Sequence, residues 1–333
     1  MSDKKPEKKT KNKSNWYLPP LKRRDFLRGS AGGMAGAWLS AWPWQQLSAQ
    51  QDLNPVTDDW DAGIVRHLLP AVNESQFLIK TSFTRALRET PRLRIQNGGS
   101  GRFIEGYLND TSGEFWQFYA TELEADTEYQ LSLQDSSGNA LCEPWPLSTF
   151  PSPQQNPERV RVLFYTCAGG PEGEYFGIND RRGNLPIAIR QRLLRRGLSF
   201  SPQAAVANGD HIYWDLHTWQ GDQAGELSPA GQQSNFDFAA RVMGGSNEEA
   251  MKLAAGPQIA PLYGTAFRST PVYFLQDDHD HWENDSPLTY PVPWFQLQLA
   301  RTTQQLYYPE FLPDATRSPG LPYSTSSARG ELS

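Results

Sequence analysis

Three short apolar runs in the second half of the chain each end in side chains of the kinds that bind metals. Residues 160–166 lead into Cys167, residues 204–207 lead into the stretch 208–213, and residues 271–275 lead into the stretch 276–281. Runs this short and this rich in apolar residues predict buried strands. In an open α/β sheet, sites form beyond the carboxyl ends of the strands, so we expect the three loops to converge on one place.

The third of these loops is unusually acidic. Residues 277–285 hold five carboxylates and two imidazoles, a density that repels itself unless a cation or a base compensates it. Taken alone, this stretch is better read as a solvated acidic loop, and Asp210 as a turn residue in Asn-Gly-Asp. Taken together behind three predicted buried strands, the loops favour a metal site.

Cys167 has an alternative reading, a disulfide with Cys142, because the chain has two cysteines and an oxidising compartment would allow the bond.

A helix is expected over residues 185–194, where Leu185, Ile189 and Leu193 recur at helical spacing. The arginines interleaved with them are most simply a solvated face.

Residues 75–150 have a different pattern. Short alternating segments such as 76–80 and 92–96 are separated by turn clusters, which predicts a β-sandwich. The stretch 123–133 resembles the corner of a fibronectin type III-like domain, where a Leu, a turn and a Tyr introduce a strand. A closing strand at 146–150 and a linker at 151–153 follow, and we expect this region to be a spacer or a substrate-gating module rather than a catalytic one.

The first 49 residues have the layout of an export signal. A basic stretch reaches Arg23-Arg24 and is followed by Asp25-Phe26-Leu27 and by a weakly apolar run at 29–44. The arginine pair resembles the twin-arginine signal, with cleavage expected after Ala49. This predicts a periplasmic or secreted protein carried by the twin-arginine translocation machinery. The resemblance to that route also implies a metal inserted before export.

Charge and hydropathy limit the partners. Residues 1–28 carry ten Lys or Arg and three acidic residues, a net charge of +7, so the rest of this chain of net charge -6 carries -13. An acidic body does not attract nucleic acid non-specifically, and we expect no stable nucleic-acid partner. There is no run of 18 apolar residues, so no permanent membrane span is expected.

The leader, the β region and the three loops together resemble the calcineurin-like metallophosphoesterases of the alkaline phosphatase D type, which are related to the purple acid phosphatases. The residues that carry the resemblance are Cys167, the stretch 209–213 and the stretch 277–280. The resemblance implies an α+β fold, an αββα four-layer sandwich that is incomplete here, preceded by a small fibronectin III-like β-sandwich. The implied domains are a leader at 1–49, the β-sandwich at 70–151 and the first part of the metallophosphoesterase domain at 158–333.

The same resemblance assigns roles to five side chains. Asp210 is similar to the carboxylate that bridges two metals, Cys167 and Tyr213 to ligands of a ferric ion, Asp278 to a ligand of the second metal, and His279 to the histidine beside the phosphate. The implied cofactor is a dinuclear centre of Fe(3+) with Ca(2+), Mn(2+) or Zn(2+), and the implied substrate is a small phosphate monoester or diester. Fe(III) is a hard ion that suits phenolate and carboxylate oxygen. His211 and His281 are expected to support the site rather than bind metal, and Asn284 and Asp285 carry no role.

The chain departs from the family's pattern at its end. The remaining metal ligands of that family lie well beyond the third motif, whereas no histidine follows His281. The sequence therefore predicts a missing C-terminal part, and two alternatives stay open: a non-catalytic metal-binding exported protein, and an inactive remnant. A Ser-His-Asp hydrolase and a nucleotide-binding fold are disfavoured, because neither a Gly-x-Ser-x-Gly elbow nor a phosphate-binding glycine motif is present.

Overall fold

The computed structural model describes residues 59–170, 185–214, 236–281 and 294–310. All of them belong to one compact unit, Leu53–Ser333. The expected leader at 1–49, with its arginine pair and cleavage point, lies outside the described residues, as do Asn284 and Asp285. In the part of the chain that the structure describes, no helix is both long enough and apolar enough to cross a membrane.

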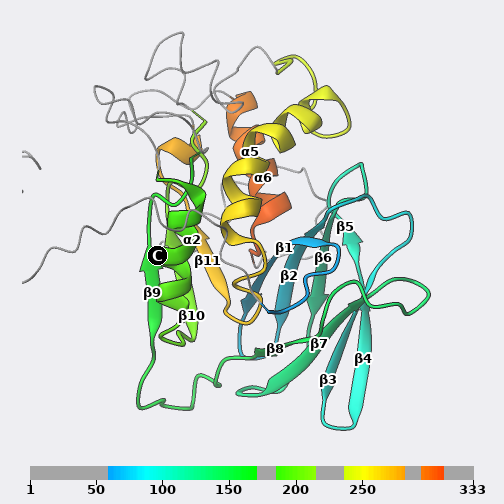
Figure 1. Ribbon diagram of the computed structural model, residues 1–333, viewed down its shortest axis with the longest axis vertical. Helices are drawn as coiled ribbons and strands as arrows, with labels where there is room; N and C mark the ends of the chain where they lie inside the picture. The colour runs from blue at the N-terminus through cyan, green and yellow to red at the C-terminus, as the bar shows by residue number, and fades with distance from the viewer. Residues whose placement is uncertain (1–58, 171–184, 215–235, 282–293, 311–333) are drawn as a thin grey trace, which may run out of the picture. The chain divides into compact units, whose positions relative to one another are not determined.

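Two four-stranded antiparallel sheets make up the first part of the described chain (Figure 1). The first sheet has the order β1 (Val65–Val72), β2 (Phe77–Phe83), β6 (Phe115–Ala120), β5 (Tyr107–Leu108). The second has the order β4 (Ser100–Glu105), β3 (Arg92–Asn97), β7 (Glu128–Gln134), β8 (Trp145–Ser148). The strands predicted around 76–80, 92–96 and 146–150 are thus confirmed as β2, β3 and β8.

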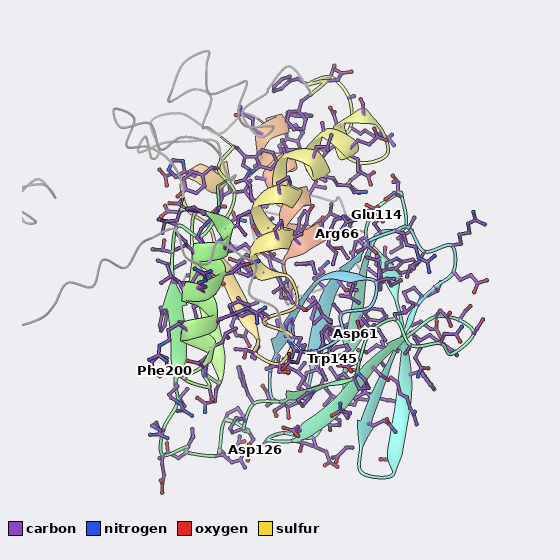
Figure 2. The ribbon with its side chains drawn as sticks, viewed as in Figure 1. Asp61, Arg66, Glu114, Asp126, Trp145 and Phe200 are labelled. Atoms are coloured by element: carbon purple, nitrogen blue, oxygen red, sulfur yellow. The ribbon has the colours of Figure 1, made fainter. Side chains whose placement is uncertain are left out.

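The two sheets pack face to face around one core. Every second residue of β3 and β7 points inward and belongs to the same core as Ile79 on the first sheet. These inward residues include Leu93, Ile95, Leu131 and Leu133. Trp145, labelled in Figure 2, is fully buried in this core. At the predicted corner, the Tyr129 hydroxyl accepts a hydrogen bond of 2.8 Å from the amide of Glu124, which fixes the turn that precedes β7.

Strands β1 and β2 are buried on both faces. Every residue of β2 is buried, and so is every residue of β1 except Arg66. Leu69 of β1 and Phe115 of β6 belong to the core formed with the helices described below, while Val65 and Phe77 belong to the sandwich core. Since a strand covered on both faces has no solvent side, a charged side chain on it needs partners inside the protein. Lys80 donates to the side chain of Gln117 (2.6 Å) and to the carbonyl of Gln305.

A three-stranded parallel sheet follows, with the order β11 (Val272–Leu275), β10 (Ala204–Asn208), β9 (Val162–Tyr165). The described helices are α2 (Ile187–Leu198), α5 (Ser246–Tyr263) and α6 (Trp294–Tyr307), with α5 and α6 side by side (Figure 1). A single turn of 3-10 helix, η3, spans His279–His281. The chain is therefore a mixed α and β protein with several sheets and few helices. The three strands predicted from the apolar runs are confirmed.

Two expectations about burial are wrong in part. Val162 and Phe164 of β9 are 39% and 69% exposed, because β9 is an edge strand and these two residues point away from the core that Leu163 and Tyr165 contact. The predicted apolar stripe of α2 is also not its buried face, since Leu193 is 60% exposed while Arg190 and Leu194 are buried. Tertiary packing overrides helical periodicity here.

A buried ion-pair network joins the sandwich to α5. The ammonium of Lys252 lies 2.7 Å from Asp110 and 2.7 Å from Glu248. Glu248 also accepts hydrogen bonds from the amide and the hydroxyl of Thr111, which follows β5. Burial by itself raises the pKa of Glu248, but hydrogen bonds from Lys252, Thr111 and Gly244 outweigh it and bring this pKa to about 2.

Replacing Lys252 with Met should destabilise the protein by about 3 kcal/mol, because Asp110 and Glu248 would be left buried without a cation. The measurement is the free energy of unfolding in urea. The control is Arg66→Met at the exposed pair with Glu114, 4.0 Å apart (Figure 2), where the loss should stay below about 1 kcal/mol. Equal losses in the two variants would show that the buried network contributes no more than a surface pair.

The pH dependence of stability should carry the mark of Glu248. Its folded-state pKa of about 2 lies below the ordinary value of 4.5, so its contribution is present above about pH 4.5 and is lost as pH falls toward 2. The urea midpoint of the wild type should therefore fall more steeply between pH 5 and about 3 than that of Glu248→Gln, which cannot titrate at this position. Parallel pH profiles would contradict the assignment.

Candidate metal centre

The five side chains that the sequence analysis assigned to a site come together at one edge of the parallel sheet. Cys167 follows β9, Asp210 and Tyr213 follow β10, and Asp278 and His279 follow β11. Because the three strands are parallel, their carboxyl ends meet at the same edge. The predicted convergence of the three loops is therefore what the structure has.

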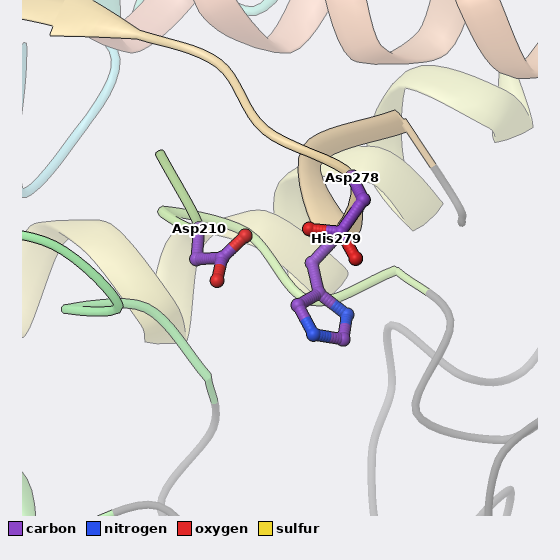
Figure 3. A group of neighbouring side chains, drawn as sticks. All are labelled: Asp210, Asp278 and His279. Atoms are coloured by element: carbon purple, nitrogen blue, oxygen red, sulfur yellow. The ribbon is translucent and has the colours of Figure 1, made fainter. Parts of the chain in front are cut away.

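Asp210 is at the centre of the group. The Cys167 thiol donates to its Oδ2 at 3.2 Å, and the Tyr213 hydroxyl lies 3.5 Å from the same oxygen. Asp210, Asp278 and His279 each offer one ligand atom, and these atoms all lie within 4.8 Å of one another. Figure 3 shows Asp210 on one loop and Asp278 and His279 facing it from the other. The His279 ring also packs against the ring of Tyr213, with centroids 4.2 Å apart.

The carboxylate of Asp210 lacks a full set of partners. The residue is 7% exposed, and its buried Oδ1 has no hydrogen-bond partner among the described residues. An unpaired carboxylate oxygen inside a protein is costly, and such groups are normally paired or coordinate a metal. Burial raises the pKa of Asp210, with the neighbouring carboxylates adding to the effect.

The Cys167 thiol and the Tyr213 phenol both have pKa values above their ordinary range. Burial, followed by the charge of Asp210, raises both pKa values. A bound cation would lower both pKa values, because its charge stabilises thiolate and phenolate directly. The donor set therefore fits a metal: sulfur, phenol oxygen, two carboxylates and an imidazole, grouped about the Asp210 carboxylate, whose Oδ1 has no hydrogen-bond partner among the described residues.

Close backbone contacts hold the loops against each other. Gly209 has a φ of +80°, and a Cβ at this position would lie 2.5 Å from the Cβ of Asp277. A Cβ on Gly169 would lie 2.2 Å from the carbonyl oxygen of His211. Gly169 therefore allows the first loop, which follows β9, to contact the second loop, which follows β10. Gly209 likewise allows the second loop to contact the third loop, which follows β11.

The two extra imidazoles differ in exposure: His211 is buried beside the site, and His281 is half-buried. His211 is 1% exposed, and its Nε2 lies 3.1 Å from the carbonyl oxygens of both Ala207 and Leu275, at the ends of β10 and β11. Burial lowers the pKa of His211 to about 4 and that of His281 also to about 4. His211 thus ties two strand ends together as a neutral ring.

The alternative pairing of Cys167 is not formed. Both cysteines are free, and Cys142 is buried in the core of the sandwich, where burial raises its pKa to about 12. Cys167 instead faces Asp210.

Three buried polar side chains next to the site had no role in the sequence analysis. Arg190 was expected on a solvated face, yet it is 6% exposed and donates to the carbonyls of residues 168–170. Asp280 was counted among the self-repelling carboxylates, yet it accepts hydrogen bonds from backbone amides. Gln258 lies on α5, and its one sequence signal is that it is an amide within the otherwise apolar run 253–262.

No protein-family model and no curated protein sequence matches the chain. Among solved structures, the chain is similar to a structure of PhoD, with 13% identity, a TM-score of 0.49, and coverage of 80% of this chain and 49% of that one. It is also similar to purple acid phosphatase PPD1 from yellow lupin (Lupinus luteus) seeds, with 11% identity, a TM-score of 0.46, and coverage of 75% and 41%. The fibronectin type III domain of human contactin 1 matches with 16% identity and a TM-score of 0.20, over 33% of this chain and 97% of that domain. The chain thus spans about half the length of the PhoD structure and less of the lupin enzyme.

Proposed function

We propose that this chain is an exported metallophosphoesterase that hydrolyses phosphate esters at a dinuclear metal centre. One observation carries the proposal: five side chains of ligand and acid-base types, delivered by three parallel strand ends, surround the buried and only partly paired carboxylate of Asp210.

Each side chain has a role in this proposal. Asp210 would bridge the two metals, Cys167 and Tyr213 would bind a ferric ion, and Asp278 would bind the second ion, Ca(2+), Mn(2+) or Zn(2+). When bound, two such ions supply an activated hydroxide and neutralise the charge that develops on the phosphoryl group.

His279 would act on the substrate. It lies beside the Asp210 carboxylate and packs against Tyr213, so its imidazole is held at the edge of the group of ligands. From there it can donate a hydrogen bond to a phosphoryl oxygen or a proton to the leaving alkoxide. The substrate class is a small phosphate monoester or diester.

The finer architecture belongs to the same proposal. We propose that the parallel sheet with α2, α5 and α6 is part of an αββα four-layer sandwich over 158–333, and that the domain at 70–151 is a fibronectin III-like module. The Tyr129 hydrogen bond at the corner before β7 and the shared core of two antiparallel sheets support the second assignment. Export by the twin-arginine machinery to the periplasm or beyond is proposed from the leader at 1–49.

Asp210→Asn should abolish hydrolysis, with a loss on the order of 10³-fold in kcat/KM, because the amide cannot bridge two cations. Turnover would be followed with p-nitrophenyl phosphate as a monoester and bis(p-nitrophenyl) phosphate as a diester, on protein whose metal content is measured by elemental analysis. The matched control is Asp135→Asn in an exposed turn of the sandwich, which should keep full activity.

The wild type distinguishes the alternatives in the same experiment. Bound metal without turnover would favour a non-catalytic metal-binding protein. Absence of both metal and turnover would favour an inactive remnant.

Tyr213→Phe should remove a visible absorption band from the iron-loaded protein, because the band arises from charge transfer between phenolate and ferric iron. Absorption spectra of the wild type, Tyr213→Phe and Tyr107→Phe, which alters an exposed tyrosine on β5, would be compared at equal iron content. A colourless iron-loaded wild type, or a band that survives in Tyr213→Phe, would count against the ligand assignment.

A further inference from the structure

Two of the candidate ligands lie on strained backbone. Cys167 has a φ of +52° and Asp210 a φ of +60°, the left-handed region that residues with a Cβ rarely adopt. Such conformations cost free energy and persist only where the surrounding structure holds them. Contacts from other residues must therefore fix these two positions.

Asp280 holds the second loop to the third. Its Oδ2 accepts from the amides of Asp210 (2.8 Å) and Asp277 (3.1 Å), and its Oδ1 accepts from the amides of His211 (2.9 Å) and Ile212 (2.9 Å). The residue is 3% exposed, so its charge is balanced by these four donors rather than by water. Three successive amides of the second loop, including that of Asp210 itself, are thereby fixed in place.

Gln258 holds the second loop to the first. Its Oε1 accepts from the amides of Gly170 (3.0 Å) and Tyr213 (2.9 Å), and its Nε2 donates to the carbonyl of Ala254 one turn earlier on α5. The side chain is fully buried. One amide group thus joins two loops that are more than 40 residues apart in sequence and anchors both to a helix.

Arg190 holds the first loop from the other side. Its Nη1 donates to the carbonyl oxygens of Ala168 (2.7 Å), Gly169 and Gly170 (3.0 Å). The first and second loops also bond directly, because the amides of Cys167 and Gly169 donate to the carbonyls of Gly209 (3.2 Å) and Asp210 (2.9 Å). The carbonyls and the amides of the first loop are therefore held by different partners.

We infer that Asp280, Gln258 and Arg190 are positioning residues that form a loop frame, which keeps Cys167 and Asp210 in left-handed conformations before any metal binds. The geometry of the site is then set by the fold and not by the metal. The frame acts through the backbone of the ligand loops and touches neither metal nor substrate. That the framed residues are metal ligands rests on the proposed function. The frame itself can be tested without metal.

Amide hydrogen exchange of the metal-free protein tests the frame at single residues. In the wild type, the amides of Gly170 and Tyr213 should exchange slowly. In Gln258→Met, which keeps the volume but removes the acceptor, these two amides should exchange about tenfold faster or more, while those of His211 and Ile212, held by Asp280, change less. The matched control is Gln304→Met, a buried glutamine on α6, which should leave all four amides unchanged.

The conservative variant provides a rescue. Gln258→Glu retains an oxygen acceptor for both amides and should keep them protected, so it also decides the matter if Gln258→Met fails to fold. Fast exchange at Gly170 and Tyr213 in the metal-free wild type, unchanged exchange in Gln258→Met, or lost protection in a folded Gln258→Glu would each overturn the inference.

Metal titration separates this inference from the proposed function. Calorimetric titration with Mn(2+) should give an affinity about 10- to 100-fold weaker in Gln258→Met than in the wild type and Gln304→Met. Equal affinities in the wild type and Gln258→Met would overturn the positioning role. A wild type that binds no metal would remove the proposed function, and the exchange rates of the metal-free protein would still decide whether the frame exists.

Discussion

The carboxylate of Asp280 is the interaction on which the rest of the site depends. It is buried at the base of the third loop and accepts hydrogen bonds from amides of both the second and the third loop. Removal of the amide donors would leave a buried charge, and removal of the charge would leave four buried amides without an acceptor. Burial raises the pKa of Asp280 to about 6, against the opposing effect of those amides, which shows how strongly the interior disfavours its charge.

Helix α5 couples the site to the sandwich. Near its start, Glu248 and Lys252 bond to the loop at Asp110 and Thr111 of the sandwich. Two turns later, Gln258 bonds to the loops that carry Cys167 and Tyr213. One helix therefore joins a loop of the sandwich to two loops of the candidate metal centre through hydrogen bonds. The β-sandwich is thus in direct contact with the helix that supports the candidate metal centre.

Much of the candidate site could be predicted from the sequence because strand ends are local features. Apolar runs that end in Cys167, Asp210 or Asp278 identify both the strand and the side chain that follows it, and parallel pairing brings the ends together. The loop frame could not be predicted in this way. Gln258 is remote from both loops in sequence, and Arg190 was placed in solvent because an arginine on an amphipathic helix is usually exposed.

The sequence by itself determined strands β2, β3 and β8 of the sandwich, the three parallel strands and the set of ligand-type side chains at their ends, since each depends on hydrophobic periodicity or on residues adjacent in the chain. Tertiary structure alone decided which polar groups are buried: Asp280 as an acceptor of amides, Arg190 as a donor to carbonyls, and Cys167 beside Asp210 rather than Cys142. The physical reason is that the cost of burying a polar group depends on partners from distant segments. Those partners exist only after the sheets and helices have packed.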